Sequence, residues 1–148
     1  MNRLLSAISI FIYMMFFTNV SFADYDLQDT LQVNFVNTTD YDCTTSVDLK
    51  HGRWDTKPPE VIPKRVSTFW IASQQNLRGP DMTITFTCGD YSFSVRNQQN
   101  FCLFKGGEQT NTTSDVDEHL NVINKQIKKA SYHDKTPGIA QIIVLSKG

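Results

Sequence analysis

The side chains with the most distinctive chemistry are three cysteines, Cys43, Cys88 and Cys102, and three histidines. No Cys-x-x-Cys spacing occurs and no histidine lies within four residues of a cysteine, so the sequence gives little support to a zinc site. We predict a Cys88–Cys102 disulfide, because these residues flank a short strand-turn-strand segment and close a loop of about fifteen residues. Cys43 is then expected to be a small, unpaired core residue, while pairing through Cys43 or an intermolecular bridge stays open.

The histidines, His51, His119 and His133, lie in polar turns or at the ends of expected elements. Cys102 with His119 or His133 is the one combination that could form a thiol nucleophile, but the predicted disulfide uses the same sulfur. The acidic run 115–119 lacks the glycine turn and the later glutamate of a calcium loop, so we interpret it as a solvated turn. These patterns predict a protein that is not an enzyme and holds no metal or cofactor.

The first 23 residues are typical of a secretory signal peptide. Arg3 precedes an apolar stretch from Leu4 to Phe17, and small residues stand before a cleavage site after Ala23. The mature chain would be residues 24–148, in a compartment where disulfides persist. Secretion is therefore predicted, with residence in the periplasm as the alternative.

Composition limits the class of protein. Of the 148 residues, 40% are hydrophobic and 11% aromatic, which is too apolar for a disordered chain. The 14 basic and 15 acidic side chains argue against a nucleic-acid partner, because such a protein needs a basic face to displace counterions from phosphates. Residues 24–148 have the length of one domain.

Apolar residues in the mature chain alternate with polar ones, the period of a β-strand with one buried face. Strands are expected at residues 31–36, 43–49, 66–73, 82–88, 91–96, 101–104 and 139–145. The last strand is expected to be buried on both faces or to lie at the centre of a sheet, since Ile142, Ile143 and Val144 are consecutive.

Three segments do not follow this period clearly. Residues 54–64 contain three prolines, which exclude a central strand and predict a loop anchored by Trp54. Residues 105–114 contain no apolar residue and are expected to form a loop. Residues 115–130 fit either a helical stripe or a strand, and the surrounding strands favour a strand, with one short helix as the alternative. The fold class predicted is all-β, a single-domain antiparallel β-sandwich.

Part of the chain resembles a known group of proteins. The likeness starts with a strand ending in Asn-x-Thr at 33–38, continues with Leu-Lys-His-Gly-Arg-Trp at 49–54 and a proline-containing loop at 58–63, and ends with Phe69 and Gly79. This order resembles the front half of the aegerolysin-like secreted β-sandwich proteins, and is loosely similar to the actinoporin type, over residues 33–86. The sequence departs from both, because the usual glycine- and threonine-rich loop is reduced to residues 78–81 and an aromatic phosphocholine cage is not recognisable.

The resemblance implies a sandwich that presents aromatic rings and cations on its end loops to a lipid interface. The expected lipid or ligand contacts are Arg53, Trp54, Lys57, Tyr91, Lys128, Lys129 and Tyr132, whereas Trp70 is expected in the core. The function this implies is that of an exported bacterial effector or toxin-like protein that binds membrane lipid or a host surface. The alternatives are a carbohydrate- or protein-binding module that uses the same end loops, which a groove lined by Trp54 and Tyr91 would favour, and a small hydrolase.

Overall fold

The computed structural model describes residues 29–102 and 106–147; the predicted signal peptide, residues 1–23, lies outside them. The described residues form ten strands. They are β1 (Thr30–Asn37), β2 (Cys43–His51), β3 (Arg53–Thr56), β4 (Val61–Ile62), β5 (Ser67–Ser73), β6 (Asp81–Cys88), β7 (Tyr91–Gln99), β8 (Gln109–Ser114), β9 (Leu120–Lys128) and β10 (Gly138–Ser146).

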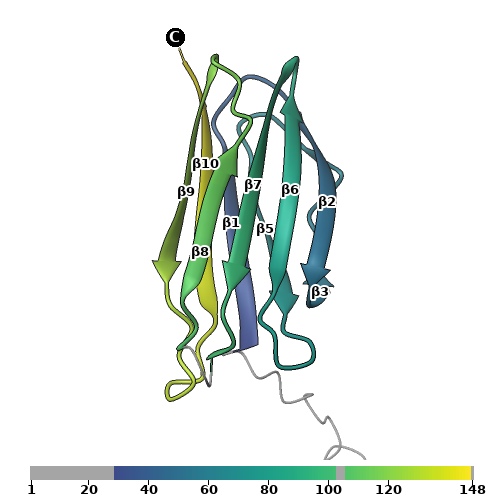
Figure 1. The fold of residues 1–148 in the computed structure, drawn as a ribbon. Coiled ribbons are helices and arrows are strands. Elements are labelled where there is room, and N and C mark those ends of the chain that lie inside the picture. The colour runs from purple at the N-terminus through teal and green to yellow at the C-terminus, as the bar shows by residue number, and fades with distance from the viewer. Residues whose placement is uncertain (1–28, 103–105, 148) are drawn as a thin grey trace, which may run out of the picture.

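Two five-stranded sheets face each other, as the all-β sandwich prediction required (Figure 1). One sheet has the order β3-β5-β1-β10-β9, and the other has the order β4-β2-β6-β7-β8. Neighbouring strands are antiparallel except β1 and β10, which are parallel and pair from Leu31–Gly138 to Asn37–Val144. The last strand therefore lies inside its sheet, between β1 and β9, which confirms a central position.

The core is filled by the inward-facing residues of both sheets. Phe35 of β1 stacks on Phe86 of β6 with ring centroids 4.6 Å apart, and Phe86 stacks on Phe93 of β7 at 4.9 Å. Trp70 of β5 is fully buried beside them, as predicted, at 6.0 Å from Phe35. Such aromatic contacts add about 0.5–1.5 kcal/mol per pair to the burial of apolar area. The Phe35–Phe86 contact joins the two sheets, whereas the other two contacts each lie within one sheet.

Several segments differ from the sequence-based expectation. Residues 109–114 form strand β8, because the backbone of this polar segment pairs with β7 from Gln99–Gln109 to Ser94–Ser114. The expected loop at 54–64 includes most of β3 and all of β4, both edge strands, so the prolines do exclude a central strand. Residues 120–128 form β9, as the favoured alternative predicted, and no helix occurs between 115 and 130. Phe101 and Cys102 lie outside any strand, and the rest of the expected strand at 101–104 lies outside the described residues.

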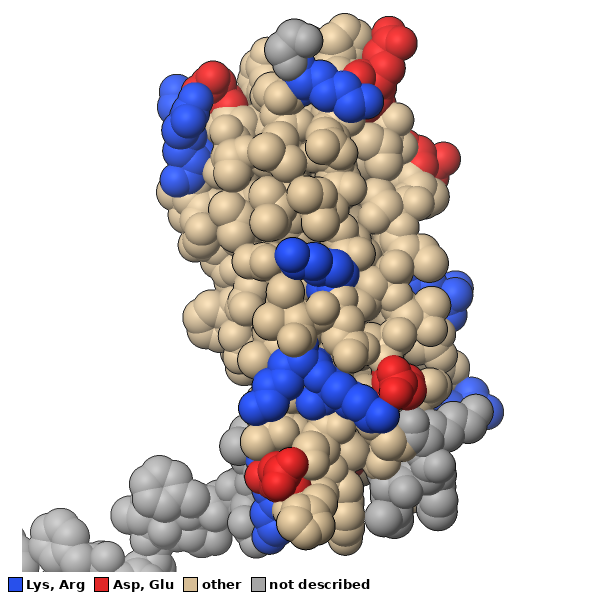
Figure 2. Space-filling view, turned by 90° about the vertical axis from the view of Figure 1, so that its left-hand side faces the viewer, with Lys and Arg blue, Asp and Glu red and all other residues tan. Residues whose placement is uncertain are grey.

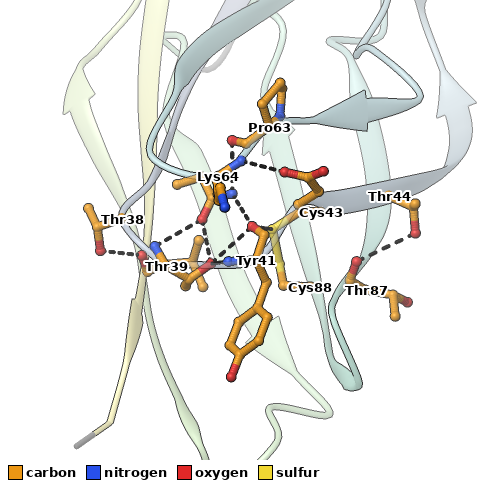
Figure 3. Close-up of a disulfide and its surroundings, with 12 residues drawn as sticks. Thr38, Thr39, Tyr41, Cys43, Thr44, Pro63, Lys64, Thr87 and Cys88 are labelled. Carbon is orange, nitrogen blue, oxygen red and sulfur yellow. Dashed lines mark hydrogen bonds between the residues drawn. A yellow bond between two sulfur atoms is a disulfide. The ribbon is translucent and has the colours of Figure 1, made fainter.

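The predicted Cys88–Cys102 disulfide is wrong. Cys43 and Cys88 lie opposite each other in the β2–β6 register and form the bridge, next to the loop residues Tyr41 and Pro63 (Figure 3). Cys102 is buried and unpaired. The physical reason is that β7 runs nine residues between Cys88 and Cys102, and an extended strand of that length separates its ends by about 30 Å.

Candidate functional site

Three chain segments meet at one end of the sandwich, which we call the basal end. They are the β5–β6 loop (74–80), the described part of the β7–β8 connection (100–102 and 106–108) and the β9–β10 loop (129–137). Figure 1 shows the β5–β6 and β9–β10 loops projecting beyond the strands at the end where β1 begins. The opposite, distal end is formed by residues 38–42, 89–90 and 115–119.

The β5–β6 loop holds an exposed leucine on a tight turn. Gln75 and Arg78 exchange two backbone hydrogen bonds of 3.1 Å, and the two residues between them, Asn76 and Leu77, have φ of 51° and 59°. Positive φ at both positions is the geometry of a type I′ turn, which favours Asn-Gly and disfavours a leucine. The side chain of Leu77 is 67% exposed, so no packing within the protein accounts for it.

The base of this loop is fixed to β7. A Cβ atom on Gly79 would lie 1.7 Å from the carbonyl oxygen of Gln99, so only glycine allows the loop to approach so closely. The amide of Gln99 also donates to the carbonyl of Pro80 at 2.9 Å. The loop therefore presents Leu77 and Arg78 from a rigid support.

The β9–β10 loop holds an exposed tyrosine in a comparable way. Ser131 and Thr136 exchange two backbone hydrogen bonds of 3.0 Å, and the Ser131 hydroxyl donates to Asp134 at 2.8 Å. Tyr132, between them, is 54% exposed. The side-chain amide of Gln109 in β8 donates to the carbonyl of Lys128 at 2.8 Å, which ties the start of this loop to the other sheet.

The two ends of the sandwich carry opposite charge. The exposed cations at or next to the basal loops are Lys50, Arg53, Arg78, Lys128, Lys129 and Lys135. Among the described residues of the basal loops the exposed carboxylates are Glu108, which pairs with Lys129 at 2.6 Å, and Asp134, and next to these loops Asp55 pairs with Arg53 at 3.6 Å. Figure 2 shows several Lys and Arg side chains on the lower half of the face seen from the β9 side, with a few Asp and Glu side chains among them, and further Lys and Arg side chains at the top of this face. At the distal end the carboxylates Asp40, Asp42, Asp90, Asp115, Asp117 and Glu118 outnumber the cations Lys64, Arg65 and Lys147.

A hollow of about 450 Å³ opens beside Leu77, lined by His51, Leu77, Arg78, Asp81, Arg96 and Phe101 among others. Arg96 donates to both carboxylate oxygens of Asp81, at 2.8 and 2.7 Å. This hydrogen bonding lowers the pKa of Asp81 below its ordinary value of 3.8, so the buried carboxylate is ionised and neutralises Arg96. The guanidinium of Arg78 lies 3.2 Å from the ring of His51.

A second hollow, of about 340 Å³, lies under Tyr132 and is lined by Cys102, Lys129 and His133 among others. It brings Cys102 and His133 to one place, whereas His119 lies at the distal end, bonded to Asp117. Burial raises the pKa of the Cys102 thiol, which opposes formation of a thiolate nucleophile. The described residues contain no group of three metal-ligating side chains.

The structure separates the residues predicted as lipid or ligand contacts into three places. Lys128, Lys129 and Tyr132 gather on the β9–β10 side of the basal end. Arg53 and Trp54 lie on β3, at the opposite edge of that sheet, and Trp54 is half-buried against the core.

The remaining two predicted contacts lie away from the basal loops. Lys57 follows β3 along the sheet edge. Tyr91 is at the distal end, where it stacks on His119 at 4.8 Å and contacts Tyr41. A groove lined by Trp54 and Tyr91, which would favour a carbohydrate- or protein-binding module, does not form, because these residues lie at opposite ends of the sandwich.

Sequence reasoning missed Leu77 and Arg78. The only signal was an apolar residue beside a cation in a loop next to Gly79-Pro80. Neither the positive φ of Leu77 nor its exposure follows from residue types alone.

Comparison with known proteins identifies the fold. No family model and no curated protein matches the chain. Among solved structures, IP-1A from Alcaligenes faecalis is similar with a TM-score of 0.59 and 13% identity, over 82% of this chain and 94% of that one. The lipid binding protein Nakanori is similar with a TM-score of 0.61 and 9% identity, over 80% of this chain and 71% of that one. The RahU protein, solved in complex with a TRIS molecule, has a TM-score of 0.61 and 8% identity, over 82% and 98%.

At these identities the likeness shows a shared β-sandwich fold, and the aegerolysin-like family stays a prediction from sequence. Within residues 29–102 and 106–147, no helix has the length and apolar character needed to cross a bilayer.

Proposed function

We propose that the protein is a non-enzymatic lipid-binding protein that attaches to a bilayer surface through its basal end. One observation carries this proposal: two loops at the same end each present an exposed apolar or aromatic side chain, Leu77 or Tyr132, beside cations. The similarity of the fold to a protein described as lipid-binding supports the same reading.

The physical basis is a combination of small contributions. An apolar side chain that leaves water for the acyl boundary contributes about 1.5–3 kcal/mol when fully buried. A tyrosine ring is favoured at the headgroup level, and each Lys or Arg near an anionic surface contributes about 1 kcal/mol. The acidic distal end is repelled by the same surface, so the charge distribution orients the molecule with its basal end toward the membrane.

We further propose that the chain is exported, as a bacterial effector or toxin-like protein acting on a host surface or as a periplasmic protein. The leader-like residues 1–23 support export. The Cys43–Cys88 disulfide is compatible with an oxidising compartment.

Co-sedimentation of the purified protein with vesicles tests the lipid-binding proposal. We expect binding to vesicles that contain phosphatidylglycerol, weaker binding to pure phosphatidylcholine, and weaker binding as salt is raised. Tyr132→Ser and Lys128→Ser should each reduce binding. Phe69→Ser, at a residue 50% exposed on β5, and Lys64→Ser, next to the distal loops, are the matched controls and should bind like wild type.

Folded protein that binds no vesicle of either composition would refute the proposal. Equal losses for Tyr132→Ser and Phe69→Ser would refute the basal end as the contact surface, because Phe69 lies in the middle of β5 and not on an end loop.

A further inference from the structure

We propose that the hollow beside Leu77 binds the phosphate group of an anionic phospholipid, with Leu77 inserted among the acyl chains next to it. This inference rests on the proposed function and adds to it a specific headgroup site. The site is formed by the β5–β6 loop and the basal ends of β2, β6 and β7.

Arg78 supplies the cation of this site. A guanidinium has five N–H donors, and the contact with His51 at 3.2 Å occupies one nitrogen. Among the described residues no carboxylate lies within ion-pair distance of Arg78, in contrast to Arg65, which pairs with Asp40 at 2.8 Å, and Lys129, which pairs with Glu108. A planar guanidinium is well suited to two-pronged binding of phosphate oxygens.

The floor of the hollow is fixed and electrically neutral. Asp81 is buried and is bound by Arg96 through two hydrogen bonds, and Arg96 also contacts Gln98 at 3.3 Å. This pair holds the strand ends in place and adds no net charge. The positive charge that attracts an anion therefore comes from Arg78, at the mouth of the hollow.

Leu77 indicates that the anion belongs to a lipid. A leucine at positive φ is strained, and Leu77 recovers little of this strain by packing, since it is 67% exposed. Backbone strain of this kind concentrates at binding sites. A site for free phosphate has no use for an exposed leucine beside the cation, whereas a membrane offers an apolar layer directly behind the phosphates.

Two substitutions and one control test the site, all in the same purified protein that is used for co-sedimentation. Leu77→Gly is expected to keep the turn, because it produces the favoured Asn-Gly sequence, and Arg78→Gln removes the cation. The control is Arg65→Gly, since Arg65 is an exposed residue near the distal end whose φ is also positive, at 60°.

We expect Leu77→Gly to weaken binding to phosphatidylglycerol vesicles about tenfold and Arg78→Gln to weaken it about fivefold. Arg65→Gly should bind these vesicles like the wild type. Wild-type protein that binds these vesicles, is weakened by Tyr132→Ser, and is unaffected by both Leu77→Gly and Arg78→Gln would overturn the headgroup site alone. A wild type that binds no vesicle would overturn the proposed function as well.

Titration with inorganic phosphate at constant ionic strength, followed by NMR shifts of the amides of residues 75–81, separates the two sources of phosphate. We expect no saturable shift. A saturable shift that Arg78→Gln abolishes and Leu77→Gly leaves unchanged would show a site for free phosphate and overturn the lipid assignment.

Discussion

Removing the Cys43–Cys88 bridge should lower the stability of the protein by a predictable amount. The bridge joins β2 to β6 across 45 residues of sequence. In the chain-entropy model a closed loop of that length is worth about 4 kcal/mol at 25 °C, which we take as an upper bound. Both cysteines are fully buried. In Cys43→Ala the free Cys88 thiol packs as a small apolar group, so the loss of the bridge is expected to dominate the change in stability. We expect Cys43→Ala to lose about 2–4 kcal/mol.

The assay is urea unfolding followed by tryptophan fluorescence, to which the buried Trp70 and the half-buried Trp54 contribute, with and without reductant. The midpoint of the wild type should fall in reductant to near that of Cys43→Ala, whose own midpoint should not respond. Cys102→Ala is the matched control: Cys102 is also buried but unpaired, so this variant should keep the response to reductant.

Two results would refute the reasoning. If Cys102→Ala abolished the response to reductant and Cys43→Ala retained it, the bridge would be Cys88–Cys102. If reductant left the wild-type midpoint unchanged, while mass analysis showed the bridge reduced, the loop-entropy argument would fail for this protein.

Four further outcomes are expected. Hydrogen bonding from Arg96 lowers the pKa of Asp81 in the folded state below its ordinary value of 3.8. The ionised carboxylate therefore stabilises the fold above pH 3.8, and this stabilisation is lost as the pH falls through the folded-state pKa. Urea midpoints between pH 7 and 3 should therefore fall more in the wild type than in Asp81→Asn, and equal slopes would contradict this account. The buried Asn37 amide donates to the carbonyls of Tyr41 at 2.8 Å and Pro63 at 3.1 Å, so Asn37→Asp should lose about 3 kcal/mol in the same assay. For the same reason folded protein from a eukaryotic host should show no glycan on Asn37 by mass spectrometry, although Asn37-Thr38-Thr39 is a sequon. Leu77→Gly should raise the unfolding free energy by about 0.5–1 kcal/mol, the positive-φ cost less the entropy of glycine, and a loss would show that Leu77 is not strained.

Local patterns predicted most strands correctly. The hairpin of β6 and β7 follows from the alternation of 82–95 around Gly89-Asp90, because both strands and their turn are contiguous in sequence. Strand β8 was missed, since its sequence, Gln-Thr-Asn-Thr-Thr-Ser, has no apolar residue and lies at a sheet edge. Its backbone pairing with β7, the bond from Asn97 to Asn111 at 2.8 Å, and the bond from Asn124 of β9 to the carbonyl of Thr112 at 3.0 Å hold it in place. Such partners are distant in sequence and leave no periodic signal.

The residues of the candidate site also differ in whether the sequence could predict them. Lys128, Lys129 and Tyr132 could be predicted because an aromatic residue beside two cations is visible within five residues. Leu77 and Arg78 could not be predicted, because their proposed role in lipid binding depends on a turn conformation and on the hollow that β2, β6 and β7 form beside them.

Residue types and their period of two by themselves determined an all-β chain with two kinds of strand face, since alternation is a local consequence of strand geometry. Only the tertiary structure decided which cysteines meet, which loops share an end, and how charge divides between the two ends. These properties depend on the register and order of strands far apart in the sequence, and long-range pairing is set by the cooperative packing of the whole sandwich. Cys43 and Cys88 are 45 residues apart in the chain and directly opposite in the sheet.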